Sequence, residues 1–273
     1  MKTCYIKNVS LVLLGLTAWL LFSCTTSPVT GRRDINLVSE GEEMQLGLSS
    51  FEQLKTSTPI SKDPAMNDMV QRVGKRIAAI ADKDMPNAKW EFVVFDSKEA
   101  NAFCLPGGKV GVYTGIMPIA KDDAGLATVM GHEIGHAVAH HGASRMSKAM
   151  VSQGVGEAAG ALVGSTKYAQ YQDTFMSLYG VGSKVAVELP YSRKQESEAD
   201  EIGVIYMARA GYDPKAAVEF WQRFSAYTQQ QGGGESSYWS KFLSTHPLDK
   251  DRIAHLQSLL PRAEAEYAKS RTK

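Results

Sequence analysis

The stretch Leu-Ala-Thr-Val-Met-Gly-His-Glu-Ile-Gly-His at residues 126–136 decides the fold. Asp122 precedes it as a plausible N-cap, and its apolar positions predict one helix. On a helix, His132 and His136 lie one turn apart on one face, so both imidazoles can reach a single metal ion. Glu133 lies about 100° further round the helix and can reach a water on that ion. The alternative is a pair of surface histidines on an amphipathic helix.

A catalytic zinc site needs a third protein ligand, and two candidates near the first helix fail. Position 142, where a further ligand histidine would follow this motif in one class of zinc peptidase, is Gly142. His140 lies about 12 Å from His132 along the helix axis, too far to share the ion. His140 and His141 are therefore expected to be structural.

A second acidic motif lies some sixty residues further along the chain. Ser192 opens a capping-box pattern with Gln195, which predicts a helix that begins near residue 193. Glu196 and Asp200 lie one turn apart on that helix, as in the gluzincin arrangement. There a carboxylate binds the metal and the following Asp accepts a hydrogen bond from a ligand histidine. The alternative is a solvated acidic helix face.

The remaining pattern predicts an α+β fold: a mostly helical gluzincin-type metallopeptidase domain with a small antiparallel sheet beside the HExxH helix. The sheet is expected from strands at Trp90–Phe95 and Lys109–Thr114, with a Pro-Gly-Gly turn between them. Further helices are expected over 39–55 and 64–82, from 193 to Gly211, after Asp213-Pro214, and after a cap at Asp249.

The N-terminus has the order of an export signal. Lys2 and Lys7 precede an apolar run, and Leu21-Phe-Ser-Cys24 resembles the lipobox of bacterial lipoproteins, which predicts lipidation of Cys24. The alternatives are a plain cleaved signal or an uncleaved anchor. The expected division is a signal peptide at 1–23, a lipidated tether at 24–38, a single metallopeptidase domain at 39–262 and a C-terminal tail at 263–273.

Composition excludes some partners. The formal net charge is +1 and no long basic run occurs, so nothing in the sequence indicates binding to nucleic acid. Of the 3 cysteines, Cys4 would leave with the signal and Cys24 would carry lipid. Cys104 then has no partner for an internal disulfide and is expected to be buried.

Four motifs, in order along the chain, resemble those of the zinc metallopeptidase family that includes HtpX, the mitochondrial Oma-type protease and the CAAX prenyl protease (family forty-eight of the metallo class). The opening Pro-Val-Thr-Gly-Arg-Arg at 28–33 is similar to the start of its periplasmic lipoprotein members LoiP and BepA, here without BepA's C-terminal repeats. The four motifs are His132–His136, Glu196–Asp200, Asn101–Gly108, and Thr245-His-Pro247 with Arg252.

The resemblance implies one zinc ion per chain, with Glu133 as the base that activates the zinc-bound water. It implies His132, His136 and Glu196 as the metal ligands. Asp200 is expected as a catalytic-site residue beside a ligand histidine.

The resemblance also implies roles for three residues outside the ligand set. Asn101 and Arg252 are expected to line the cleft and bind substrate. His246 is expected in the catalytic site, where it can occupy the open position of zinc and hold the enzyme inactive.

Two further expectations come from the mechanism rather than from the resemblance. The reaction needs a donor to the oxyanion, and His246 is the candidate. The strand Lys109–Thr114 is expected to bind extended peptides by β-augmentation.

Together these features predict an exported zinc metalloendopeptidase that hydrolyses misfolded or unassembled proteins of the cell envelope. Lipid would anchor it in the periplasm, with the outer membrane favoured because Thr25 rather than Asp follows Cys24. Unfolded envelope proteins and the outer-membrane assembly machinery are the expected partners. The alternatives are a chaperone-like assembly factor for outer-membrane proteins with little or gated proteolysis, a purely structural lipoprotein, and a metal hydrolase that does not cut protein.

Overall fold

The structure is a computed structural model, and it describes residues 24–152, 175–177, 179, 192–230, 242, 246 and 251–272. The predicted signal peptide at 1–23 and the predicted cap Asp249 lie outside these residues.

Helices dominate the described chain, and the predicted mostly helical α+β class is confirmed. The helices are α2 Glu40–Ser57, α3 Pro64–Ala81, α4 Met117–Ala120, α5 Asp123–Val138, α6 His141–Ser152, α8 Arg193–Arg209, α9 Lys215–Gln230 and α11 Arg252–Ser270, with a short 3-10 helix, η1, at Thr114–Ile116. The strands are β1 Cys24–Thr26, β2 Arg33–Ile35, β3 Glu91–Phe95, β4 Ala102–Leu105 and β5 Lys109–Tyr113.

The predicted helix starts are confirmed by their caps. The Asp63 side chain accepts hydrogen bonds from the first turn of α3, and the Asp122 side chain accepts one from the first turn of α5. Ser192 and Gln195 form the reciprocal capping box that begins α8. Gly211 follows the last turn of α8 with φ of 81°, a left-handed conformation that glycine adopts without steric cost.

The three-stranded sheet is mixed, with the order β3-β5-β4. The predicted antiparallel pairing of its two longer strands is wrong, because β3 and β5 run parallel. The physical reason is an additional strand, β4, which the Pro-Gly-Gly turn joins to β5 as an antiparallel hairpin. The central position therefore belongs to β5, and β4 lies at one edge.

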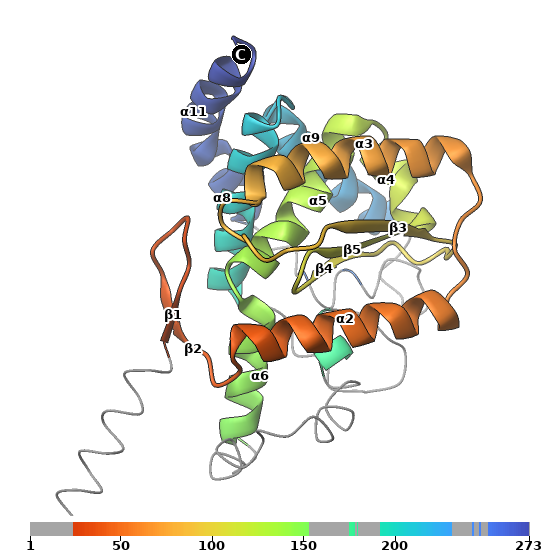
Figure 1. Ribbon diagram of the computed structural model, residues 1–273. Helices are drawn as coiled ribbons and strands as arrows, with labels where there is room; N and C mark the ends of the chain where they lie inside the picture. The colour runs from red at the N-terminus through yellow and green to blue at the C-terminus, as the bar shows by residue number, and fades with distance from the viewer. Residues whose placement is uncertain are drawn as a thin grey trace, which may run out of the picture.

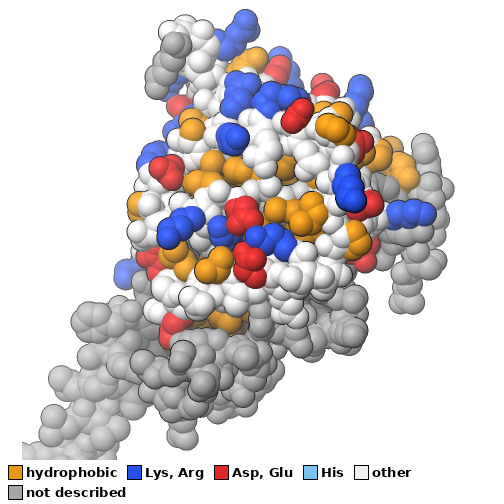
Figure 2. Space-filling view, turned by 45° about the vertical axis from the view of Figure 1, so that its right-hand side comes forward, with side chains coloured by type: hydrophobic (Ala, Val, Ile, Leu, Met, Phe, Trp, Pro, Cys, Tyr) orange, Lys and Arg blue, Asp and Glu red, His pale blue; other side chains and the backbone are white. Residues whose placement is uncertain are grey.

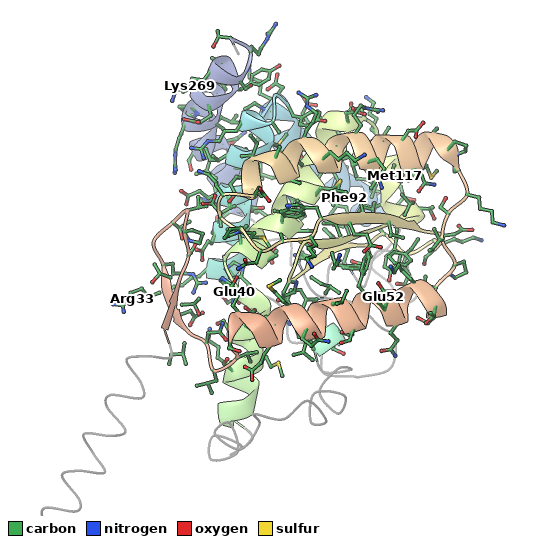
Figure 3. All side chains as sticks on the ribbon, in the orientation of Figure 1. Arg33, Glu40, Glu52, Phe92, Met117 and Lys269 are labelled. Carbon is green, nitrogen blue, oxygen red and sulfur yellow. The ribbon has the colours of Figure 1, made fainter. Side chains whose placement is uncertain are left out.

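The sheet lies between α3 on one side and α2 on the other (Figure 1). Side chains alternate between the two faces, as the pleat requires. Phe92 and Val94 of β3 pack in the core that includes α3, α5 and α8, whereas Phe95 packs in a second core with Phe51 of α2. Figure 3 shows Phe92 pointing from β3 toward α3, while Glu52 lies on α2, beyond the other face.

Helix α5 is the centre of the larger core. Every residue from Gly125 to Val138 is buried, and α5 contacts the sheet, α3, α8 and α9. Because α5 is buried on all sides, most of its side chains are apolar, and the polar residues His132 and Glu133 are exceptions. Each of them needs a partner inside the protein.

Two expected peripheral segments have regular structure. Residues 24–38, expected as a tether, contain the antiparallel pair β1 and β2. Residues 263–270, expected as part of a tail, continue α11, and Ala263 is fully buried.

No described helix is both long enough and apolar enough to cross a membrane. On the face shown in Figure 2, acidic and basic side chains are interspersed and no large field of one charge forms. This mixture agrees with the formal net charge of +1.

Candidate metal centre

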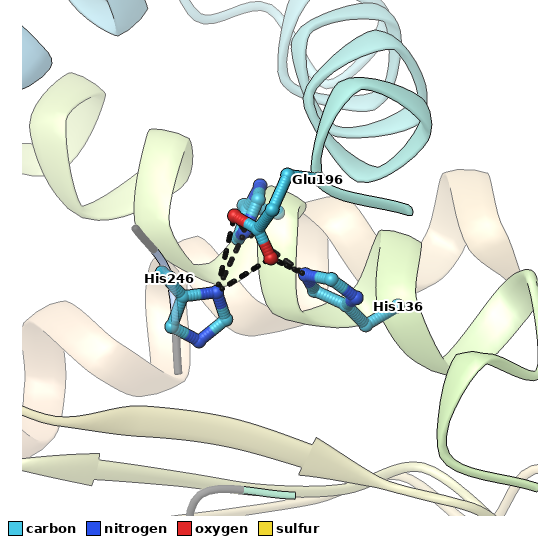
Figure 4. A group of neighbouring side chains, drawn as sticks. His136, Glu196 and His246 are labelled. Carbon is cyan, nitrogen blue, oxygen red and sulfur yellow. Dashed lines mark hydrogen bonds and ion pairs between the residues drawn. The ribbon is translucent and has the colours of Figure 1, made fainter. Parts of the chain in front are cut away.

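Four buried side chains meet between α5 and α8. His132, His136, Glu196 and His246 each offer one ligand atom, and these atoms all lie within 4.8 Å of one another. α5 supplies two histidines and α8 supplies the carboxylate, which Figure 4 shows pointing toward His136 and His246. The structure thus brings together the predicted ligands of α5 and α8.

The spacing of the donor atoms suits a tetrahedral ion. Ligands about 2.0–2.1 Å from a tetrahedral zinc are about 3.3 Å from one another. His132 Nε2 lies 3.0 Å from His136 Nε2 and 3.5 Å from Glu196 Oε2, and His136 Nε2 lies 3.3 Å from Glu196 Oε1. Two imidazole nitrogens and a carboxylate are ligands that zinc accepts, so these residues fit the predicted metal.

The fourth corner of this arrangement is filled by His246. Its Nδ1 lies 3.3 Å from His132 Nε2 and 3.1 Å from Glu196 Oε1. Its Nε2 faces Glu133 Oε1 at 3.5 Å. His246 thus stands between the predicted ligands and the predicted base.

Asp200 and Arg252 contact the predicted ligands His132 and Glu196. Asp200 Oδ1 lies 2.9 Å from His132 Nδ1. Arg252 donates to Asp200 at 2.7 Å and to Glu196 at 2.8 Å, and its guanidinium lies 3.4 Å from the ring centre of Trp221. Burial alone would lower the pKa of His132, but hydrogen bonds to Asp200 and Glu196 outweigh burial and raise it to about 9.

Glu133 is buried beside this cluster, with 3% of its surface exposed. Burial raises the pKa of its carboxyl above the usual value, while His246 and His132 oppose the shift. A carboxylate with a raised pKa is a better proton acceptor near neutral pH. The position and environment of Glu133 suit the predicted base.

The two predicted substrate-binding residues come from different elements, since Asn101 precedes β4 and Arg252 begins α11. Asn101 is buried just before β4, and its carbonyl accepts a hydrogen bond from the Tyr113 backbone. Arg252 is also buried and bonds the carboxylates of the cluster. Substrate binding by either residue stays a prediction, as does lipidation of Cys24.

Two residues at the site were missed by the sequence reasoning. His141, expected to be structural, lies with Nδ1 2.8 Å from His136 Nδ1, and its Nε2 lies 3.2 Å from Glu198 Oε2. Glu198 lies two residues from both Glu196 and Asp200 on α8, so helical spacing places it on another face. The sequence feature that could have indicated Glu198 is its position between the acidic residues Glu196 and Asp200.

Comparison with known proteins agrees with this geometry. The model of Peptidase family M48 matches residues 64–260. The chain is 36% identical over 243 residues to the mitochondrial metalloendopeptidase OMA1 of Schizosaccharomyces pombe, covering 88% of this chain and 67% of the relative. It is 30% identical to OMA1 of Saccharomyces cerevisiae, covering 97% and 77%.

A bacterial relative is more distant and longer. The chain is 29% identical over 237 residues to the beta-barrel assembly-enhancing protease of Escherichia coli, covering 85% of this chain and 46% of that protein. The family match covers more than half of the chain and includes α5 and α8, which carry the cluster. The chain therefore belongs to Peptidase family M48 and is a metalloendopeptidase.

Proposed function

We propose that this metalloendopeptidase is zinc-dependent and that His132, His136 and Glu196 hold the ion. The observation that carries the proposal is a buried set of two imidazole nitrogens and one carboxylate, in which the nitrogens lie 3.0 Å apart and each lies 3.3–3.5 Å from an oxygen of Glu196. When bound, zinc supplies a Lewis acid that polarises a carbonyl and makes water a nucleophile near neutral pH.

The residues around the ligands prepare them for this task. Asp200 accepts a hydrogen bond from His132 Nδ1–H, which leaves the Nε2 lone pair directed into the cluster. Arg252 pairs with the carboxylates of both Asp200 and Glu196, so neither buried charge is left alone. Arg252 thus positions ligands in this proposal.

Glu133 moves the proton in the proposed reaction. Its carboxylate accepts a proton from the attacking water and delivers it to the nitrogen of the leaving amine. Its side chain lies within the buried site, where water exclusion strengthens charge interactions.

His246 is proposed as a gate. Its Nδ1 lies beside both His132 and Glu196, at the corner that substrate or water would need. Movement of His246 would open that corner. The alternative function, an assembly factor with gated proteolysis, draws on the same observation.

The proposed substrates are misfolded or unassembled envelope proteins in extended form. β4 pairs only with β5 among the described strands, so its outer edge is the candidate for β-augmentation. The strand expected for this role, β5, is paired on both sides and cannot accept a peptide. Two further features support this substrate class: the export-like N-terminus, with lipid on Cys24 as the proposed anchor, and the name of the Escherichia coli relative.

The decisive experiment replaces Glu133 and measures cleavage and zinc together. We expect Glu133→Gln to keep stoichiometric zinc and a native thermal transition but to lose hydrolysis of casein. Glu219→Gln, at an exposed position on α9, is the matched control and should cleave normally. Casein hydrolysis by Glu133→Gln at the wild-type rate would refute the mechanism. Complementation of a deletion strain by that variant would favour the assembly-factor alternative.

A further inference from the structure

A series of hydrogen bonds leads from the metal centre through His136 to His141 and Glu198. His136 Nδ1 lies 2.8 Å from His141 Nδ1, and both residues are buried, with 1% and 0% of their surfaces exposed. Two ring nitrogens at this distance share one proton, so one of them donates and the other accepts.

The direction of the proton follows from the ligand role of His136. Its Nε2 faces His132 and Glu196, so in the metal site this nitrogen carries the lone pair and Nδ1 carries the hydrogen. His136 therefore donates to the Nδ1 lone pair of His141. The hydrogen of His141 must then be on Nε2, which lies 3.2 Å from Glu198 Oε2 and donates to it.

Glu198 ends this series as a buried anion. Besides His141, its carboxylate accepts hydrogen bonds from the Thr30 hydroxyl and from Arg32 Nε. All three partners can donate to this carboxylate, and Arg32 also forms an ion pair with it.

We propose that His141 is a positioning residue for the metal ligand His136 and that Glu198 orients it, held in turn by the N-terminal segment Thr30–Arg32. The inference rests on the proposed function, because it takes His136 to bind zinc through Nε2.

The two ligand histidines are then supported in parallel ways. His132 donates directly to Asp200, which Arg252 pairs with. His136 donates to His141, and His141 in turn donates to the carboxylate of Glu198. Both carboxylates lie on α8, the helix that also supplies the ligand Glu196.

The N-terminal hairpin of β1 and β2 contacts Glu198, the carboxylate that supports His136 through His141. Thr30 and Arg32 lie in the connection between β1 and β2, more than 160 residues before Glu198 in the chain. The hairpin thus supplies the outermost hydrogen bonds that fix His136. Its Pro-Val-Thr-Gly-Arg segment acts on the metal site and is not only a spacer.

The test uses two variants that each keep one of the two contacts of His141. Asn places an acceptor oxygen at the position of Nδ1, whereas Gln places a donor amide at the position of Nε2. Phe keeps the ring volume and loses both contacts. The matched control is His140→Asn, because His140 is the neighbouring histidine, bonds Glu43 instead, and has a φ of 52° that Asn tolerates.

Zinc dissociation constants would be measured on the purified protein by competition with a chromogenic chelator. We expect His141→Phe and His141→Gln to bind zinc about 10- to 100-fold more weakly, the range for lost support of a ligand. His141→Asn keeps the acceptor for His136 but loses Glu198, so it should lose less affinity than the Phe and Gln variants, and His140→Asn should stay near the wild type. Wild-type affinity in His141→Phe, or equal losses in the Asn, Gln and Phe variants, would overturn the proposal.

A second measurement does not depend on the variants folding. The chain has 6 histidines, so ring nitrogen resonances of the zinc-loaded wild type can be assigned by nitrogen-15 NMR. We expect His136 to carry its hydrogen on Nδ1 and His141 to carry its hydrogen on Nε2 at neutral pH. The opposite tautomer of His141 would overturn the inference. Failure of wild-type protein to bind zinc would instead overturn the proposed function.

Discussion

Gly203 of α8 lies against Gly131 of α5, and the two helices touch backbone to backbone there. A Cβ atom at Gly203 would meet the backbone nitrogen of His132 at 2.7 Å and the carbonyl carbon of Gly131 at 2.9 Å. A Cβ atom at Gly131 would meet the carbonyl oxygen of Gly203 at 2.9 Å. Because α5 carries the histidines and α8 carries Glu196, this approach sets the distance between the metal ligands.

Gly203→Ala should therefore disturb both stability and the metal site. The added methyl group meets backbone atoms, which cannot rotate away, so the helices must separate. We expect a loss of about 1–3 kcal/mol in the free energy of unfolding, together with weaker zinc binding. Urea denaturation and chelator competition measure the two effects.

Gly41→Ala is the control for this substitution. Gly41 is an exposed helical residue on α2, and a Cβ atom there would meet nothing within 4 Å. Alanine should stabilise the protein by about 0.5–1 kcal/mol, because glycine costs helix entropy. Equal behaviour of the two alanine variants would show that the close approach does not control the site.

Local signals in the sequence predicted the helix starts and the pairing of α5 with Glu196. Those features depend on caps and on residues one turn apart, such as His132 and His136, which helical spacing fixes directly. The strand β4 was missed because four residues between a motif and a turn carry little pattern. The parallel pairing of β3 with β5 depends on that missing strand, so it was missed too. The contact of His141 with Glu198 joins residues 57 apart, and no local rule fixes such a contact.

Substitution of His246 should raise activity if the residue is a gate. In His246→Ala the corner beside Glu196 and His132 is free, and three ligands remain. We expect zinc to be retained and unfolded casein to be cleaved faster than by the wild type. His255→Ala, which removes a histidine that bonds the Ser197 carbonyl instead, should leave the rate unchanged. A slower rate with zinc retained would indicate that His246 donates to the oxyanion.

Arg252 should contribute most to the stability of the fold when the protein is metal-free. Without its guanidinium, the buried carboxylates of Glu196 and Asp200 lose their shared cation. We expect Arg252→Met to lower the free energy of unfolding of the chelator-treated protein by about 3–5 kcal/mol. Bound zinc supplies positive charge beside Glu196, so the loss should be smaller in the zinc-loaded protein.

Arg262→Met provides the comparison for Arg252→Met. Arg262 pairs with Glu201 on the surface, with 54% of its side chain exposed. Such a pair contributes about 0–1 kcal/mol, whether or not zinc is present. Thermal melts of both variants, with and without chelator, test the dependence on metal. If Arg252→Met loses the same stability with and without zinc, the proposal that Arg252 and zinc both compensate the charge of Glu196 is refuted.

Asp34 should make docking of the N-terminal hairpin depend on pH. It lies on β2 and accepts hydrogen bonds from Arg32 at 2.8 Å, from Lys148 of α6 at 3.1 Å, and from the Ser144 hydroxyl. Burial alone would raise the pKa of Asp34, but Ser144, Arg32 and Lys148 outweigh burial and hold the pKa below its usual 3.8.

The sign of the effect follows from that lowered pKa. A carboxyl with a lower pKa in the folded state contributes its full stability above its unfolded value, and the contribution is lost as the pH falls through the folded value. We expect Asp34→Asn to lower the free energy of unfolding by about 1–2 kcal/mol at pH 7. The difference from the wild type should stay constant down to about pH 4 and shrink below it.

Urea denaturation of the metal-free protein across this pH range measures the difference without interference from zinc release. Asp68→Asn, at an exposed position on α3, should show little difference at any pH. A gap between Asp34→Asn and the wild type that widens as the pH falls would contradict the sign. The same hairpin carries Arg32, so Asp34→Asn should also weaken zinc binding if the hairpin supports His136.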